Sequence, residues 1–231
     1  MPVAAGRPAE STIMSNAFSE IAFTRGVAAV QERNGSRAAM RRFTALAPED
    51  RAMGAREMAF IAARASFYQA TVSETGWPYV QHRGGPAGFL RVLDAGTLGY
   101  ADFRGNVQYV SAGNLGSNDR VALILVDYAT RERLKIWGRA RIVEIAATAS
   151  ETSAAVSAGD AEFMASVALP AYRARVERGI LIRVEAFAWN CPQHIPLAHD
   201  AAELQRIVTP LQEENRRLRA QLDALRSLPH G

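Results

Sequence analysis

The hydrophobic period of this chain changes at Phe67, and that change restricts the fold more than any other feature. Before Phe67, apolar residues recur with helical spacing; after it, they form short β-type runs separated by turn residues. The turn Glu74–Thr75–Gly76 joins one pair of runs into a hairpin, and Asp94–Ala95–Gly96 joins another. Six or seven antiparallel strands with few helices predict a mainly β barrel or sandwich. The strands are expected near residues 67–73, 77–83, 87–93, 97–102, 120–127, 132–144 and 179–189.

The residues before this sheet predict a loose arm over 1–20 and a helical segment over 21–66. Thr24 can cap a helix that runs through Arg33, and Ser36 can cap another that ends near Leu46. A third helix is expected to begin near Pro48, with a buried stripe formed by Met58, Ile61, Ala62 and Ala65.

Two strands carry specific patterns. Val121–Val126 is apolar on both faces, so it should be covered by the barrel interior on one side and by a helix or a second subunit on the other. In the run 131–143 one face is apolar and the other cationic, and the cationic face has no carboxylate. That favours an anionic partner over a strand that simply faces water. The cationic face consists of Arg133, Lys135, Trp137, Arg139 and Arg141.

The C-terminal segment 199–231 predicts a helix with a zipper-like repeat. Thr209 and Pro210 resemble an N-cap and a first helical residue, so Pro210 is expected to interrupt any earlier helix. A single Asn at an a position is a device that fixes register in a parallel dimer. The alternative is an amphipathic helix that docks on its own domain. The d positions are Leu204, Leu211, Leu218 and Leu225, and the a positions include Val208, Asn215 and Leu222.

Composition excludes several classes of protein. The single cysteine, Cys191, excludes an intramolecular disulfide framework and a cysteine-rich zinc site, and favours the cytoplasm. The longest aliphatic run is far too short to cross a bilayer, and no signal peptide is evident, so no membrane association is expected. A net charge of +4 does not argue for nucleic acid.

The chemistry-bearing residues gather at strand ends. No hydrolase, Rossmann or P-loop motif is present, and Cys191 with His194 gives too few ligands for a zinc site. Arginines suit a phosphate, and aromatic faces with amides suit a planar heterocycle, so together they suit flavin mononucleotide (FMN). The segments are Gln81–His82–Arg83, Phe103–Arg104–Gly105–Asn106, 131–135 and 189–194.

A family resemblance covers roughly Phe18 to Ile195. The runs FYQATVSETGWPYVQHRGGPAGFLRVLD, YADFRGN, GNLGSNDRVALILVDY, RERLKIWGRARIV and AWNCPQHI are similar to those of the pyridoxamine 5′-phosphate oxidase-related FMN-binding proteins. The resemblance implies a split β-barrel over 67–198, a homodimer, and FMN bound in the cleft between the subunits.

The resemblance also implies the cofactor-binding residues. These are Gln81, His82 and Arg83 on one strand; Tyr100, Ala101, Asp102, Phe103, Arg104 and Asn106 on the next strand end; Arg133 and Lys135; and Trp189, Asn190 and Gln193. The chain departs from true oxidases at Gly84–Gly85–Pro86 and at Gly105–Asn106–Val107. The residues that bind the phosphate are therefore expected to be Arg83, Arg104 and either Arg131 or Arg133.

The function expected is that of an FMN-dependent oxidoreductase acting on an unidentified small-molecule substrate or electron donor. No catalytic residue and no metal site is assigned; His82 and His194 are the candidates for proton transfer at neutral pH. One alternative is a flavin-binding redox sensor or carrier without turnover. Another is a barrel that binds haem, with Cys191, His82 or His194 as ligand.

Overall fold

The computed structural model describes residues 16–46, 52–145, 157–190, 193–197 and 201–226. These fall into two compact units. The first contains the described residues up to Asp127 and those from Glu132 to Asn190; the second contains Tyr128–Arg131 and the described residues from Gln193 onward.

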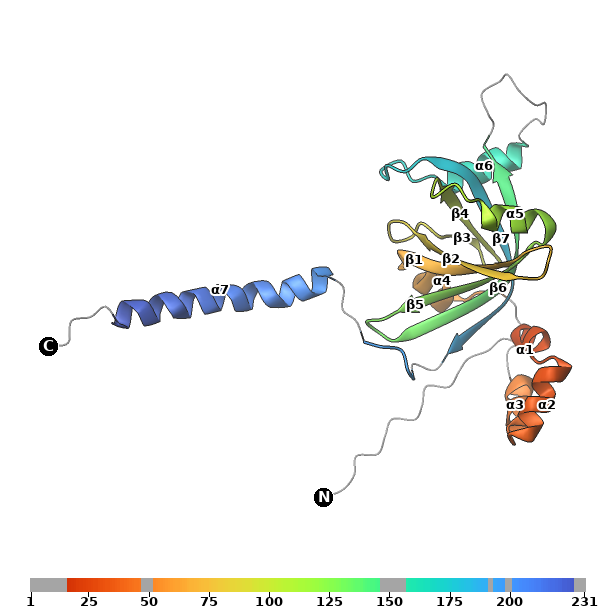
Figure 1. Ribbon diagram of the computed structural model, residues 1–231, viewed down its shortest axis with the longest axis horizontal. Helices are drawn as coiled ribbons and strands as arrows, with labels where there is room; N and C mark the ends of the chain where they lie inside the picture. The colour runs from red at the N-terminus through yellow and green to blue at the C-terminus, as the bar shows by residue number, and fades with distance from the viewer. Residues whose placement is uncertain (1–15, 47–51, 146–156, 191–192, 198–200, 227–231) are drawn as a thin grey trace. The chain divides into compact units, whose positions relative to one another are not determined.

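The first unit is built on a seven-stranded antiparallel sheet that curves around a common interior (Figure 1). The strand order is β2-β1-β5-β6-β7-β4-β3, so β2 and β3 are the edge strands. Together with its flanking helices the sheet forms a mainly β split barrel. The strands are β1 (Ser66–Val72), β2 (Pro78–Gly84), β3 (Arg91–Asp94), β4 (Thr97–Phe103), β5 (Arg120–Asp127), β6 (Glu132–Glu144) and β7 (Val176–Asn190).

Alternating inward residues on β5 and β6 fill much of the barrel interior. On β5, Val121, Leu123 and Leu125 are buried, and on β6 the inward residues include Leu134 and Ile136. Aromatic rings cross the interior between strands, since Phe67 on β1 lies 5.4 Å from Tyr100 on β4 and 5.5 Å from Phe89. A bulge in β7, where Trp137 pairs with Ala186 and Gly138 with Val184, leaves Glu185 unpaired in the ladder.

Helices cover parts of the barrel. Phe18 of α1 stacks on Trp137 at 4.7 Å over the outer face of β6, next to Ala186 and Ala188 of β7. Phe163 of α6 packs against β4 and β7. The helices of this unit are α1 (Asn16–Ala22), α2 (Arg25–Arg33), α3 (Arg37–Leu46), α4 (Ala55–Ala62), α5 (Val110–Ser117) and α6 (Ala158–Val167).

The structure confirms most of the expected elements. All seven strands are present, and Thr24 caps α2 by accepting a hydrogen bond from the Val27 N–H at 3.3 Å. The cationic and apolar faces of β6 are as expected, because its register with β5 has no shift. The third expected strand is shorter, since Gly88 has a φ of +78° and β3 begins only at Arg91.

Two expectations about the helices were wrong. Residues 16–20 belong to α1 and not to a loose arm, because Phe18 buries its ring on the sheet; residues 1–15 lie outside the described part. The buried stripe of α4 is Glu57, Phe60 and Ile61, while Ala62 and Ala65 are exposed. The start expected near Pro48 lies outside the described residues, and α4 begins at Ala55.

The C-terminal helix α7 (Ala201–Arg226) runs through Pro210 instead of beginning there, which corrects the expected start. Proline lacks the N–H that would bond to the carbonyl one turn earlier. A side-chain hydrogen bond spans the turn before the proline, because Gln205 Nε2 donates to Thr209 Oγ1 at 3.2 Å. The helix therefore carries the whole expected heptad pattern as one element.

Candidate functional site

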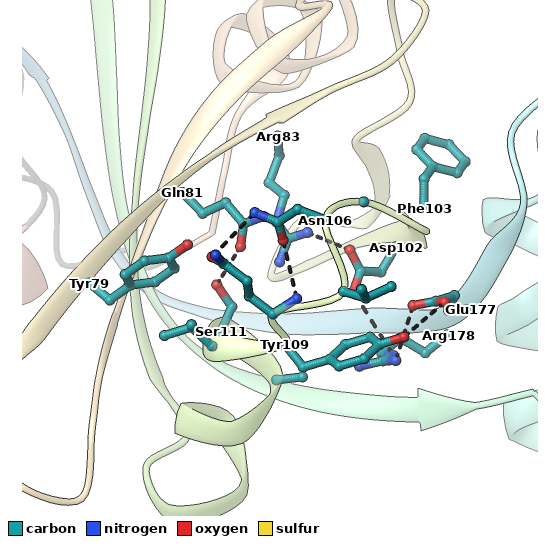
Figure 2. Close-up of a pocket in the computed structure, with 15 residues that line it drawn as sticks. Tyr79, Gln81, Arg83, Asp102, Phe103, Asn106, Tyr109, Ser111, Glu177 and Arg178 are labelled. Carbon is teal, nitrogen blue, oxygen red and sulfur yellow. Dashed lines mark hydrogen bonds and ion pairs between the residues drawn. The ribbon is translucent and has the colours of Figure 1, made fainter.

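A small polar pocket lies among β2, the end of β4, the start of α5 and the start of β7 (Figure 2). Its volume is about 40 Å³. The side chains that line it are mostly polar or charged, although it sits at the end of an apolar barrel. They are Tyr79, Gln81, Arg83, Asp102, Phe103, Asn106, Gln108, Tyr109, Ser111, Glu177 and Arg178, with Gly105, Val107, Val110 and Ala112.

Arg83 and Asp102 form the central ion pair of this pocket. Alternation along β2 turns Gln81 and Arg83 toward the interior, opposite the buried Gln69 and Phe67 of β1. Arg83 Nη1 donates to Asp102 Oδ1 at 2.5 Å, and the two side chains are only 13% and 11% exposed. The contact joins edge strand β2 to β4, which are not neighbours in the sheet.

Arg178 extends the ion pair into a chain of alternating charges. It lies opposite Asp102 in the β4–β7 ladder, and its Nε is 4.0 Å from Asp102 Oδ2. Arg178 Nη2 also lies 3.4 Å from Glu177 Oε2, and Tyr109 donates its hydroxyl to Glu177 at 3.2 Å. Arg104 joins at the rim, where its Nε is 3.8 Å from Glu177. Two cations therefore face each other across one carboxylate.

The pKa of Asp102 is raised. Burial is the main cause, because it disfavours the charged carboxylate, and the opposing attraction of Arg83 and Arg178 does not fully offset it. Asp102 thus holds the arginines in place while being easier to protonate than an exposed aspartate.

The Nε group of each pocket arginine donates no hydrogen bond to a described residue. The Nε atoms of Arg83 and Arg178 are buried and have no hydrogen-bond partner among the described residues. Buried donors in native proteins are almost always paired, but the Nε atoms of Arg37, Arg91 and Arg133, which do not line the pocket, also lack a partner among the described residues. What distinguishes the pocket is that two guanidinium groups line it together, and such a pair suits an oxyanion such as phosphate.

The loop between β4 and α5 closes the pocket in a strained conformation. Val107 and Tyr109 have φ values of +56° and +54°, which L residues rarely adopt, least of all a β-branched valine. The loop is held by Asn106 Oδ1, which accepts from the Gln108 N–H at 3.2 Å, and by Ser111, which donates to Gln81 at 2.9 Å. Strain of this kind is concentrated at functional sites in proteins.

Five of the predicted cofactor residues meet in this pocket: Gln81, Arg83, Asp102, Phe103 and Asn106. Arg104 lies at its rim through Glu177. Tyr100 lies beneath the pocket in the core, where its hydroxyl donates to Gln69 at 2.8 Å and burial raises its pKa. Ala101 is also buried and faces Phe163 of α6.

The other predicted residues lie elsewhere. His82, Arg133 and Lys135 alternate onto the outer face of the sheet, so Arg133 does not join Arg83 in the pocket. There the ring of His82 lies 5.4 Å from that of Tyr68, and Lys135 Nζ lies 4.9 Å from the ring of Phe18. Burial, followed by the charge of Arg133, lowers the pKa of Lys135.

The residues predicted in the segment 189–194 belong partly to the first unit and partly to the second. Trp189 is in the core, where its Nε1 donates to Glu57 Oε1 at 2.7 Å. Asn190 pairs with Arg133 at the end of β7. Gln193 and His194 are exposed residues of the second unit, which also contains Arg131, and Cys191 lies outside the described residues.

Arg178 is the main residue that sequence reasoning missed. The predicted last strand began at 179, three residues after the observed start at Val176, so Arg178 was not placed in the sheet. Its approach to Asp102 depends on the β4–β7 register, which no local pattern encodes. Tyr109 and Ser111 were missed because no sequence signal places the start of α5 beside β2 and β7.

In the part of the chain that the structure describes, no group of three or more His, Cys, Asp or Glu side chains could hold a metal ion. No helix among the described residues is long and apolar enough to cross a membrane.

Comparison with known proteins identifies the family. Residues 53–186, more than half of the chain, match the family model described as pyridoxamine 5′-phosphate oxidase. None of the curated proteins matches the chain.

Solved structures give distant similarities. HupZ of Group A Streptococcus is 20% identical, with a TM-score of 0.41, over 64% of this chain and 100% of that one. An FMN-binding protein from Syntrophomonas wolfei is 10% identical, with a TM-score of 0.40, over 58% and 82%. A protein of the pyridoxinephosphate oxidase family from Clostridium acetobutylicum, related to general stress protein 26, is 13% identical, with a TM-score of 0.38, over 64% and 94%. On the family match, this chain belongs to the pyridoxamine 5′-phosphate oxidase family.

Proposed function

We propose that this protein is an FMN-binding oxidoreductase, with the FMN phosphate held in the pocket around Arg83 and Arg178 and the flavin ring held between two copies of the chain. The observation that carries this proposal is that Arg83 and Arg178, two largely buried arginines, line one pocket, in a chain of the pyridoxamine 5′-phosphate oxidase family.

The residues of the pocket fit a phosphate. A phosphate accepts several hydrogen bonds, and Arg83, Arg178 and the side-chain amides of Asn106 and Gln81 carry donors around the pocket. Asp102 and Glu177 offset part of the positive charge, and Asp102 can relieve the repulsion by taking up a proton, because its pKa is already raised.

The size of the pocket supports a shared site. A volume of about 40 Å³ can hold a phosphate-sized group, while a site for a whole organic ligand is typically about 300 Å³ or more. The ring of an FMN anchored here would therefore extend beyond the pocket. A second copy of the chain would cover it.

The outer face of β1, β2, β5 and β6 is the surface that such a second copy would fit. Val80 and Tyr68 are 60% and 41% exposed there, and Ala122 and Ile124 of β5 lie beside them, half-buried. A largely apolar groove of about 470 Å³ runs over this face beside Trp137. A patch of this kind is typical of an interface between subunits. It would give β5 the second cover that its apolar outer residues require.

Bound FMN would supply hydride or electron transfer, and the chain would bind and orient it. Arg83 and Arg178 would hold the phosphate, and the outer-face residues would exclude water from the ring. Asp102 and Glu177 are engaged by arginines, which argues against either carboxylate as a general base. His82 remains the candidate for proton transfer, beside Tyr68 on the outer face.

Substitution of each pocket arginine tests the phosphate contact. In Arg83→Gln and Arg178→Gln, the affinity for FMN should fall by about tenfold or more, since a hydrogen bond to a charged group contributes about 1.5–3 kcal/mol. The affinity for riboflavin, which lacks the phosphate, should not change. Arg141→Gln is the control, because Arg141 is exposed and pairs with Asp160 on α6. Equal losses for FMN and riboflavin would point to misfolding or a different ligand pose.

Measuring catalytic turnover distinguishes an oxidoreductase from the alternative of a redox sensor or carrier without turnover. FMN-loaded protein should oxidise NADPH or NADH over many cycles in air. A single reduction of bound flavin without further cycles would support the carrier instead.

A further inference from the structure

The C-terminal helix α7 has an apolar stripe that the proposed flavin site does not explain. Its d positions Leu204, Leu211 and Leu218 are 46%, 65% and 52% exposed, and its a positions Val208 and Leu222 are 38% and 48% exposed. A continuous stripe of this length marks a contact surface. The residue types at the a, e and g positions indicate what kind of partner the stripe contacts.

The residues within the stripe favour a pair of helices. A β-branched residue at a with leucine at d, as in Val208 and Leu211, favours two strands over three or four. Asn215 occupies the next a position. One asparagine at an a position costs stability, and it fixes register by bonding to the same asparagine of an aligned partner.

The flanking charges favour a parallel partner. In a parallel pair, a g residue faces the e residue of the next heptad on the other helix. Glu214 is at g and Arg219 is at e, so each Glu214 would face the partner's Arg219. In an antiparallel pair e faces e, and Arg219 would meet glutamine or arginine. Glu214 already bonds to Arg217 in its own helix at 2.8 Å, but its side chain remains 46% exposed.

We infer that the α7 helices of two copies pair as a parallel, in-register, two-stranded coiled coil over Val208–Leu222. The pairing needs no flavin, so it stands apart from the proposed function. A parallel pair has two-fold symmetry, as a homodimer of barrels would, and both contacts can belong to one dimer. Tethered tails would raise the effective concentration of one barrel beside the other.

Cysteine cross-linking in the full-length chain tests this pairing directly. Cys191→Ser removes the only native cysteine, and Leu211→Cys or Leu218→Cys then places one thiol at a d position. In a parallel, in-register pair the two copies of either cysteine meet, so each variant should form an interchain disulfide under mild oxidation. Glu213→Cys and Ala220→Cys, two residues further on at the outward f positions, are the matched controls and should remain monomeric on a non-reducing gel.

The outcomes separate the alternatives. Cross-linking at both d positions and at neither f position supports the inference. Cross-linking at only one d position overturns it in favour of an antiparallel pair, because such a pair brings like residues together only near its centre. Cross-linking at neither d position overturns it in favour of a helix that docks on its own chain. Equal cross-linking at d and f positions also overturns it, since that is random collision.

Discussion

Asp102 is the residue on which the geometry of the pocket depends. Among the described residues it is the one carboxylate paired with both Arg83 and Arg178, and without it two buried cations would face each other. Its pKa is raised because burial disfavours the charged form more than the two arginines favour it. The same residue should therefore influence stability as well as ligand binding.

The pH dependence of stability tests this role. A carboxyl whose pKa is raised above its ordinary value of 3.8 binds more protons in the folded than in the unfolded state. Its contribution to stability is therefore fully present at low pH and is lost as the pH rises through the raised pKa. In urea unfolding followed by tryptophan fluorescence, the free energy of unfolding of the unsubstituted protein minus that of Asp102→Asn should fall over this window. A difference that instead grows with pH would mean that the ion pairs dominate and that the pKa is lowered.

Residue types alone predicted only part of the pocket. Arg83, Gln81 and Asn106 could be found because cations and amides gather at strand ends, and alternation along β2 separates Arg83 from His82. Arg178 could not be found, since only the long-range register of β7 against β4 brings it to Asp102. Cationic residues on β6 pointed to an anion, yet Arg133 and Lys135 face the outer surface and not the phosphate-sized pocket.

Elements of this fold are positioned by glycines as well as by apolar side chains. Gly99 on β4 and Gly179 on β7 form a socket for Phe163 of α6: a methyl group added at Gly99 would lie 2.5 Å from Phe163 Cε2, and one at Gly179 would lie 2.6 Å from Phe163 Cε1. α6 can approach the sheet because these positions carry no side chain.

Alanine at Gly99 should therefore destabilise the barrel by about 1–3 kcal/mol, the usual cost of overpacking a core. Gly116→Ala is the matched control, because Gly116 is an exposed residue of α5 with open space around it. There alanine should be neutral or stabilising by up to about 1 kcal/mol, since it favours the helix. Urea unfolding compares the two variants, and equal stabilities would contradict the packing of α6 on this sheet.

The strands were predictable because most strands of this barrel alternate between a more buried and a more exposed face and have a clear turn at their ends. The helices were less predictable. The burial of Phe18 in α1 depends on Trp137, more than a hundred residues later, and α7 continues through a proline that local rules treat as a start.

At the scale of the whole molecule, the proposal requires two copies of the chain for one complete flavin site. Ala122→Arg tests that requirement, because Ala122 lies on the outer face of β5 opposite Ala70 and Trp137. A bulky cation there should weaken FMN binding by about tenfold or more if it separates the barrels. Ala161→Arg, at an exposed position of α6, is the control and should bind FMN normally. The mass in solution should remain that of a dimer in both, because the α7 pair does not involve this face.

A titration of the purified protein with FMN and with riboflavin, followed by flavin fluorescence, tests whether the pocket holds the FMN phosphate. We expect saturable binding of one FMN per chain, with an affinity about tenfold or more above that for riboflavin, because only FMN carries a phosphate that can bind to Arg83 and Arg178. Equal affinities for the two flavins, or no binding of FMN, would contradict it.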